Sequence, residues 1–319
     1  MKIGMVTDSL AHLSFDELLR QSAELGLDCV EFPTGNWSAA PHINIDALLD
    51  SDKNRREFLA RVRDHGLEIS ALTANGNPLH PKSGVEQDAC LRKTIRLAAL
   101  MNIERVNAMS GLPGGRGDAN PNWVTVAWPP DCHEILDYQW NEVALPYWQE
   151  LVAFSNNAGI HKICLELHGG QLVYNCETFN RLRNAVGDTV GVNLDPSHLL
   201  WMGADPIACV RELGDAIYHV HAKDALIDNR NCAINSRLET AHSAKVAERS
   251  WSYVTLGYGQ DEGWWKRFCY ALRVVGYDDV LSIEHEDVTL SRLEGVRKSI
   301  ELLKRSIALE ASDYELPNI

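Results

Sequence analysis

Residues 163–198 have the sequence ICLELHGGQLVYNCETFNRLRNAVGDTVGVNLDPSH, which contains one complete structural repeat of the chain. Ile163–Leu167 and Val190–Leu194 are short apolar runs, which predict two buried strands. Between them, Thr178–Val186 has the apolar spacing of an amphipathic helix. A strand, a helix and a second strand in this order predict a βα repeat with parallel strands.

The same alternation of strand and helix recurs along the whole chain. The predicted strands are Ile3–Val6, Cys29–Phe32, Ile69–Leu72, Arg105–Ala108, Ile163–Leu167, Val190–Leu194, Ile217–Val220 and Val280–Ile283. The predicted helices are Phe15–Leu25, Arg55–His65, Ala89–Met101, Tyr147–Ala158, Thr178–Val186, Pro206–Leu213 and Gly263–Val275. Several of these helices are followed by a glycine, which is a common helix stop. Eight repeats without a linker predict an α/β fold, a single (β/α)8 TIM barrel over residues 1–311, with a C-terminal tail at 312–319.

Two segments are longer than a minimal barrel requires. Gly111–Trp140 follows the fourth strand, and Ala225–Gly263 follows the seventh. Both leave the C-terminal end of the barrel, where barrel enzymes build their active sites. We therefore expect long loops there that form walls or lids over a pocket. A surface excursion or an oligomer contact is the alternative.

The composition argues against several kinds of partner. The chain has 30 Lys and Arg against 44 Asp and Glu, which gives a net charge of −14. Such a chain repels phosphate polyanions, so nucleic acid and anionic membranes are not expected partners. The eight cysteines are scattered without a Cys-x-x-Cys pair, and the sequence shows no secretory leader and no membrane-spanning run. These features predict a cytoplasmic protein.

Polar groups gather where the last four strands end. The sequences there are Cys164-Leu-Glu166-Leu-His168, Asn193-Leu-Asp195-Pro-Ser-His198, His219-Val-His221-Ala-Lys223-Asp224 and Ser282-Ile-Glu284-His-Glu286-Asp287. Side chains alternate between the two faces of a strand, so Glu166 shares a face with His168, and Asp195 shares one with Asn193. We expect the polar faces to point into the barrel. Carboxylates that converge there would repel one another unless a cation lies between them.

A divalent metal would satisfy such a cluster. Three carboxylate ligands and one imidazole suit Mn²⁺, Mg²⁺ or Co²⁺ better than an ion that prefers thiolates, and Zn²⁺ stays an alternative. We predict one divalent metal, with Mn²⁺ as the first choice.

Through these four motifs, and over nearly its whole length, the chain resembles the xylose-isomerase-like barrel superfamily. That superfamily includes sugar isomerases, ketose epimerases, inosose dehydratase and a branch of DNA-repair endonucleases. Asn75-Gly-Asn77-Pro-Leu-His80, after the third strand, is similar to a subgroup called sugar phosphate isomerase/epimerase. The resemblance implies that the metal ligands are Glu166, Asp195, His221 and Glu284. It also implies that His198 borders the substrate.

Two departures from the superfamily narrow the expected activity. Ketose 3-epimerases carry a substrate-binding Glu and Arg where this chain has Leu172 and Ile227. The DNA-repair branch carries additional His ligands where this chain has Asn75 and Asn107. A standard ketose epimerase and a DNA-repair enzyme are therefore both disfavoured.

The run Glu166-x-His168-Gly-Gly-x-Leu-Val-Tyr174-Asn175 resembles instead barrel proteins that eliminate the aglycone from 3-keto-glycosides, including catalytic subunits of C-glycoside deglycosidases. This resemblance implies a metal-dependent lyase that acts on a small sugar or glycoside. His168 would then remove H2 of the 3-keto sugar, because imidazole works as a base near neutral pH; orienting Glu166 or a water is its alternative role. The alternative functions are an isomerase or epimerase that uses Glu166 and Glu284 as acid and base, an inosose dehydratase-like enzyme, and a non-catalytic sugar-binding barrel.

Four further residues are predicted to bind substrate: Asn75, His198, Lys223 and Asp224. For His198 the alternative is helix capping, and for Lys223 and Asp224 it is an ion pair between the two. His219 lies one layer deeper than His221 and is expected to be a packed core residue. The resemblance also implies a homodimer or homotetramer, and the deglycosidase branch implies a small accessory subunit.

Overall fold

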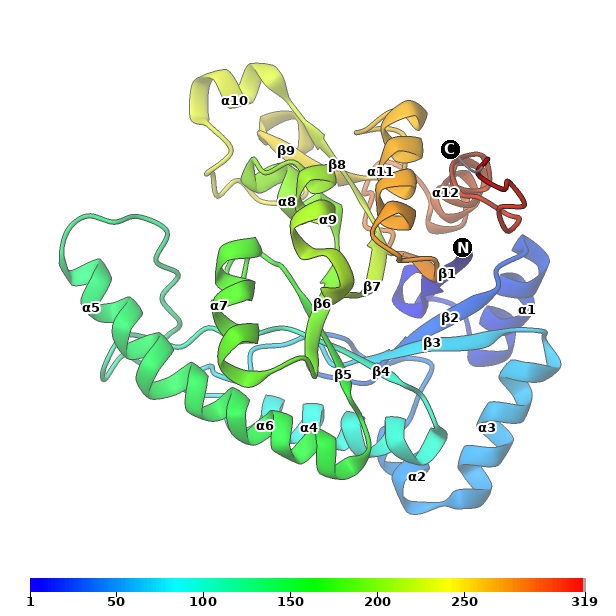
Figure 1. The fold of residues 1–319 in the computed structure, drawn as a ribbon, viewed down its shortest axis with the longest axis horizontal. Helices are drawn as coiled ribbons and strands as arrows, with labels where there is room; N and C mark the ends of the chain where they lie inside the picture. Colours follow the sequence, from blue (N-terminus) through cyan, green and yellow to red (C-terminus); the bar gives the residue numbers. More distant parts are fainter. Residues whose placement is uncertain (318–319) are drawn as a thin grey trace.

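The computed structural model describes residues 1–317 and contains a closed barrel of parallel strands (Figure 1). The barrel strands are β1 (Lys2–Val6), β2 (Cys29–Pro33), β3 (Glu68–Thr73), β4 (Arg105–Ala108), β5 (Lys162–Glu166), β6 (Val190–Leu194), β7 (Ile217–Ala222) and β10 (Val280–Ile283). They follow the order β1, β10, β7, β6, β5, β4, β3, β2, and β1 pairs in parallel with both β10 and β2, which closes the ring. The predicted (β/α)8 barrel is confirmed.

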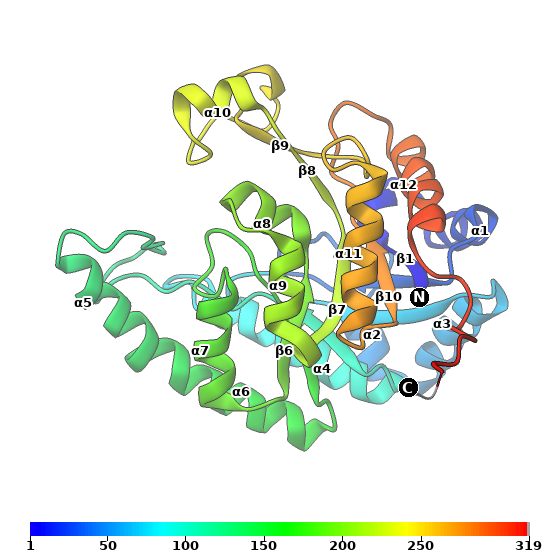
Figure 2. The ribbon, with the colours of Figure 1, turned by 45° about the horizontal axis from the view of Figure 1, so that its top comes forward.

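Helices surround the barrel, as Figure 2 shows. They are α1 (Phe15–Leu25), α2 (Ile45–Asp50), α3 (Asp52–Asp64), α4 (Gly84–Met101), α6 (Leu145–Ala158), α7 (Cys176–Val186), α8 (Pro196–Met202), α9 (Pro206–Leu213), α11 (Glu262–Val274) and α12 (Arg292–Ser306). Short 3-10 helices are η1 (Thr7–Leu10), η3 (Gly214–Ala216) and η4 (Val246–Glu248). Local chemistry sets the helix ends: Ser14 and Glu17 form a reciprocal capping box at the start of α1, and Gly26, with φ 73°, ends it.

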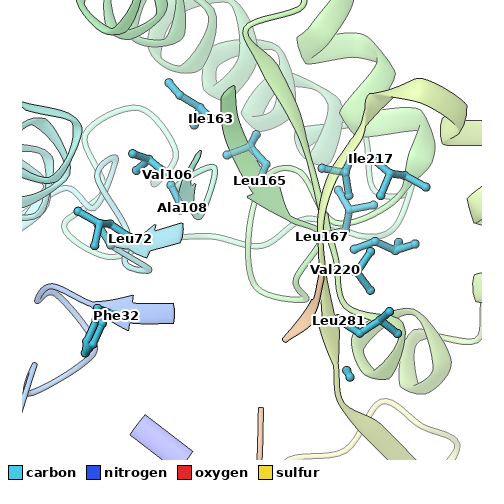
Figure 3. Close-up of a cluster of buried hydrophobic side chains, with 14 of the residues drawn as sticks. Phe32, Leu72, Val106, Ala108, Ile163, Leu165, Leu167, Ile217, Val220 and Leu281 are labelled. Atoms are coloured by element: carbon cyan, nitrogen blue, oxygen red, sulfur yellow. The ribbon is translucent and has the colours of Figure 1, made fainter. Parts of the chain in front are cut away.

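Apolar side chains on the outer faces of the strands form the hydrophobic core (Figure 3). Phe32, Leu72, Val106 and Leu165 are among the fully buried ones. The next residue toward the inner face is polar or charged in β2 to β5: Glu31, Thr73, Asn107 and Glu166. Because strand side chains alternate, the apolar set packs toward the helices and the polar set fills the barrel.

The two long segments contain regular structure. After β4, the chain forms α5 (Asp131–Asp137) and the π-helix η2 (Tyr138–Ala144), which continues into α6. After β7, strands β8 (Asp224–Ile227) and β9 (Trp251–Val254) pair antiparallel, with α10 (Asn229–Asn235) between them. Figures 1 and 2 show α5 and α10 as the outlying parts of the molecule. The expected loops are therefore a helical arm and a hairpin.

The end of the chain and the cysteines can be described briefly. The last helix, α12, ends at Ser306, and residues 309–317 are exposed and form no helix or strand. Residues 318–319 of the predicted tail lie outside the described part of the chain. All eight cysteines are free thiols. Within residues 1–317, no helix has the length and apolar character needed to cross a membrane.

Candidate metal centre and active site

The four predicted metal ligands meet at the carboxyl ends of four strands. Glu166 ends β5, Asp195 directly follows β6, His221 lies in β7 and Glu284 directly follows β10. Each offers one ligand atom, and these atoms all lie within 4.8 Å of one another. Glu166, Asp195 and His221 are buried, and the side chain of Glu284 is 20% exposed. The structure therefore contains a cluster that could hold a metal ion, while the role of each residue as a ligand stays a prediction.

Unpartnered atoms within this cluster test whether a metal fits. Asp195 Oδ2, His221 Nδ1 and Glu284 Oε2 are buried and have no hydrogen-bond partner among the described residues. His221 Nδ1 lies 3.2 Å from Glu284 Oε2 and 3.6 Å from Glu166 Oε2, so these atoms face one another. Glu284 Oε2 also lies 3.2 Å from Lys223 Nζ, and Asp195 Oδ2 lies 3.3 Å from His198 Nε2, but neither contact forms a hydrogen bond. Buried polar atoms without hydrogen bonds cost free energy, and a shared divalent cation would reduce that cost. The donor set of three carboxylates and one imidazole fits such an ion.

The charges of the cluster are only partly balanced by protein groups. Burial, together with the nearby Glu166 and Glu284, raises the pKa of Asp195 to about 7 despite the positive charge of Lys223. Burial alone would also raise the pKa of Glu284, but Lys223 and His221 hold it well below its usual range. Lys223 Nζ lies 3.2 Å from Glu284 and 2.9 Å from Glu286. His221 is a second cation, because Glu31 and Glu284 raise its pKa well above the usual value although burial opposes them. The carboxylates still outnumber these two cations, and a net negative site attracts a further cation.

His198 and Tyr253 hold Glu166 in place. His198 is fully buried, its Nε2 lies 2.8 Å from Glu166 Oε1, and its Nδ1 lies 2.9 Å from the hydroxyl of Tyr253. Burial lowers the pKa of His198 well below its usual value, so the ring is neutral. A carboxylate can only accept, so Nε2 carries the proton and Tyr253 donates to Nδ1. His198 does not line the cavity described below, and its predicted contact with substrate stays a prediction.

A cavity of about 820 Å³ opens beside the cluster. It is lined by Glu166, His221 and Glu284, and it extends past the segments that follow β1, β2 and β10. Its size lies in the range of roughly 300–1,000 Å³ that small-molecule pockets occupy. It is therefore large enough for a small sugar or glycoside.

His168 lies in the wall of this cavity. Its Nδ1 donates to the carbonyl oxygen of Gly169, which can only accept, so the proton of the neutral ring is on Nδ1. Burial, with a smaller contribution from His198, lowers the pKa of His168 to about 3. The Nε2 atom has no hydrogen-bond partner within residues 1–317. His168 therefore offers a free lone pair, while the edge of Trp37 approaches its ring with 6.3 Å between the centroids.

Of the other three residues predicted to bind substrate, two line the cavity and one does not. Asn75 lines the cavity and its Nδ2 donates to Glu166 Oε2 at 2.8 Å. Lys223 also lines the cavity. Asp224 does not: its carboxylate accepts backbone N–H bonds from the loop after β9, including Gly257 at 3.0 Å. The alternative of a Lys223–Asp224 ion pair is wrong, because Lys223 pairs with Glu284 and Glu286 instead.

Three residues of the site were not singled out by the sequence motifs. Glu31 in β2 bonds to both His219 and His221, and its signal was an acidic residue within an apolar strand. Asp8 follows β1 and lines the cavity. Tyr253 comes from the hairpin after β7, and no strand-end pattern points to it. His219 is buried as expected, but it belongs to this polar network rather than to an apolar core.

Comparisons with known proteins agree with the fold. Residues 19–306 match the family model described as "Xylose isomerase-like TIM barrel". A Bacillus subtilis (strain 168) protein named "Uncharacterized protein YfiH" is 49% identical over 312 residues, which are 97% of this chain and 100% of that protein.

Two solved structures show the same architecture. The probable 3-DHS dehydratase AsbF from Bacillus anthracis, described as involved in petrobactin synthesis, is similar with a TM-score of 0.67 and 18% identity, over 95% of this chain and 99% of that one. The IOLI protein, solved with a bound zinc atom, is similar with a TM-score of 0.66 and 18% identity, over 97% and 100%. At these identities, the likeness shows the fold alone.

Proposed function

This chain belongs to the xylose isomerase-like TIM barrel family, and from that premise we propose that it is a divalent-metal-dependent lyase acting on 3-keto-glycosides. One observation carries the proposal. Three residues of the four-residue cluster, Glu166, His221 and Glu284, line one cavity, and the fourth, Asp195, is buried behind it. The wall of the same cavity contains a neutral imidazole with a free Nε2, that of His168. An electrophilic centre and a base on one cavity are what proton removal next to a carbonyl requires.

The proposed reaction is an elimination. His168 Nε2 takes H2 of the 3-keto-glycoside, and the electron pair of the C2–H bond forms a C1–C2 double bond. The bond from C1 to its substituent breaks. The substituent leaves with the electron pair of this C1 bond and gains a proton. The products are an unsaturated 3-keto sugar and the free aglycone, so no oxidant or reductant is needed.

The low pKa of His168 sets a condition on the substrate. The sequence predicted a base that works near neutral pH, but burial lowers the pKa of His168 to about 3. Such a ring is a weak base, so the proposal requires that the proton it removes is acidified. A carbonyl at C3 supplies that acidity to H2. This favours a 3-keto-glycoside over a simple glycoside, in which C2 has no neighbouring carbonyl.

The cluster residues would hold the metal, and we propose Mn²⁺, with Mg²⁺, Co²⁺ and Zn²⁺ as the ions to compare. When bound, the ion supplies a Lewis acid for the carbonyl and an adjacent hydroxyl oxygen. Asn75 and Lys223 line the cavity and are the proposed contacts to sugar hydroxyls. Substrate contacts of His198 and Asp224, a homo-oligomer, an accessory subunit and a cytoplasmic location stay predictions.

The test uses the metal-loaded protein with a 3-keto-glucoside and, separately, with free ketoses in D₂O, followed by NMR and mass spectrometry. We expect release of the aglycone together with an unsaturated 3-keto sugar. His168→Ala should reduce the rate by about 10²–10⁴-fold, the usual contribution of a general base. His133→Ala, on the exposed surface of α5, is the matched control and should leave the rate unchanged.

Other results would point elsewhere. Deuterium incorporation into a ketose with formation of an epimer or aldose, without aglycone release, would replace the lyase by an isomerase or epimerase. Sugar binding without any turnover, with or without metal, would leave a non-catalytic sugar-binding barrel.

A further inference from the structure

A second carboxylate lies directly against the metal-centre histidine from the opposite side of its ring. Glu31, in β2, is fully buried and is not one of the four clustered ligands. Its Oε1 lies 3.1 Å from Nε2 of His221, while Nδ1 of the same ring faces Glu166 and Glu284. One imidazole therefore joins Glu31 to the cluster.

Glu31 is held firmly by side chains from four strands. Its Oε1 also accepts from Asn107 Nδ2 at 2.9 Å and from the hydroxyl of Thr73. Its Oε2 accepts from His219 Nε2 and from Ser282 Oγ, both at 2.8 Å. A carboxylate with so many fixed donors has little freedom to rotate, so it presents Oε1 to His221 in one orientation.

This contact decides where His221 carries its proton. An ionised carboxylate can only accept, so the atom facing Glu31, Nε2, must be the N–H. The structure places Asn193 Nδ2 3.1 Å from this Nε2, while Asn193 Oδ1 is buried without a partner. The two ends of an amide are assigned from the hydrogen bonds around them, and two donors cannot face each other, so the Nε2–H requires the amide to be turned with Oδ1 toward the ring. Nδ1 is then the atom left to bind a metal. Although burial opposes it, Glu31 and Glu284 raise the pKa of His221 well above its usual value, so in the metal-free fold Nδ1 also carries a proton, 3.2 Å from Glu284 Oε2, and metal binding would release that proton.

We propose that Glu31 is a positioning residue for the metal centre, which fixes the Nε2–H tautomer of His221, orients the ring and makes Nδ1 the ligand atom. The inference rests on the proposed function only through the metal site and needs no particular sugar chemistry. A carboxylate behind a metal-binding histidine fixes its tautomer and increases its basicity, and losing such a partner typically weakens metal binding by about 10–100-fold. Glu31 should act on the metal through His221 without touching it.

The first experiment compares metal affinity in three proteins. Zn²⁺ is titrated into wild type, Glu31→Gln and Ser282→Ala in competition with a chromophoric chelator. Ser282→Ala is the matched control, because it removes one donor to Glu31 and leaves the His221 contact in place. We expect about 10–100-fold weaker binding for Glu31→Gln, near-wild-type binding for Ser282→Ala, and recovery of Glu31→Gln activity at high metal concentration. Equal affinity of wild type and Glu31→Gln would overturn the proposal.

A second measurement needs no variant and covers the case in which Glu31→Gln does not fold. In ¹⁵N-histidine-labelled wild-type protein loaded with Zn²⁺, His221 should show a protonated, slowly exchanging Nε2 and a metal-bound Nδ1. A metal-bound Nε2 would refute the inference.

These experiments distinguish failure of the Glu31 proposal from failure of the lyase proposal. Weaker Zn²⁺ binding by Glu31→Gln in a protein that releases no aglycone would support the role of Glu31 and reject the lyase. Aglycone release by a protein in which Glu31→Gln binds Zn²⁺ like wild type would do the reverse. No Zn²⁺ binding by the wild type would reject both.

Discussion

In the cluster of predicted metal ligands, neighbouring carboxylates determine which ring nitrogen is protonated in two buried histidines, His198 and His221. His198 donates its Nε2–H to Glu166, and His221 donates its Nε2–H to Glu31, since carboxylates only accept. In the first case the other ring nitrogen must accept, which makes the Tyr253 hydroxyl a donor. A chain of hydrogen bonds therefore runs from the hairpin through His198 to Glu166, one of the predicted metal ligands.

Tyr253→Phe should make the side chain of Glu166 less well ordered, although Tyr253 acts on it only through His198. It leaves His198 Nδ1 buried without a donor, which costs about 1–3 kcal/mol. We expect weaker metal binding and a kcat/KM lower by roughly 5–150-fold, the same free energy expressed as a ratio. Both would be measured beside Tyr258→Phe, a half-exposed tyrosine that contacts Lys298. Equal effects of the two variants would show that the bond to His198 does not matter.

At the scale of elements, the hairpin of β8 and β9 is fastened to the barrel at both ends. Asp224 begins β8 and accepts backbone N–H bonds from Gly257 and Gln260, both at 3.0 Å. After β9, Thr255 donates its backbone N–H to Asp287 at 2.9 Å, in the segment that follows β10. These two carboxylates hold the strand that carries Tyr253 over the cavity.

Asp224→Asn separates a structural role for this carboxylate from its predicted role in substrate binding. The amide presents an N–H group to backbone donors, so bonds to the loop after β9 are lost. We expect a loss of about 1–3 kcal/mol in the free energy of unfolding and faster hydrogen exchange at Gly257 and Gln260. A raised KM with unchanged stability and exchange would instead support contact with substrate.

The strands of the barrel were predictable because their apolar runs and their alternation are local features. The predicted strand Val190–Leu194 and helix Phe15–Leu25 have the observed bounds. Other helices begin at residues different from those predicted, because a capping side chain fixes the first turn. The helix α3 begins at Asp52 rather than at Arg55, because the Ser51 hydroxyl accepts the backbone N–H of Asn54. The convergence of Glu166, Asp195, His221 and Glu284 followed from parity and from their positions at successive strand ends.

The missed parts of the site depend on contacts between distant segments. Tyr253 reaches His198 only because β8 and β9 pair, and no periodicity in the intervening residues shows that pairing. Glu31 lies in the strand Cys29–Phe32, far from the polar motifs in sequence, and it meets His221 only across the closed barrel. Sequence patterns indicate which face a residue occupies, but they do not indicate which partner lies opposite.

At the scale of the whole molecule, a metal at this centre would join β5, β6, β7 and β10 through their ends. An ion that binds only the folded barrel adds RT ln(1 + [M]/Kd) to the free energy of unfolding, about 2.7 kcal/mol at a hundredfold excess over Kd. At roughly 2–4 °C per kcal/mol for domains of comparable size, this predicts a rise in Tm of several degrees. Removal of the metal with EDTA should reverse it.

The size of that rise should depend on pH through Asp195. Its pKa in the metal-free fold is raised to about 7 from an ordinary value near 3.8, so the folded state holds a proton that the unfolded chain releases. The contribution of Asp195 to metal-free stability is therefore lost as pH rises toward and through 7. Metal binding needs the ionised Asp195 carboxylate, and it also needs His221 to lose the second proton that Glu31 and Glu284 stabilise against the effect of burial. Below pH 7, protonation of Asp195 should therefore lower the affinity by up to about tenfold per unit in addition to the effect of His221. Thermal unfolding at pH 6 and pH 8, with Mn²⁺ or EDTA, should show a larger metal-dependent Tm rise at pH 8.

Asp195→Asn should show little rise in Tm at either pH. An equal rise in the wild type at both pH values would mean that Asp195 is already ionised in the metal-free protein.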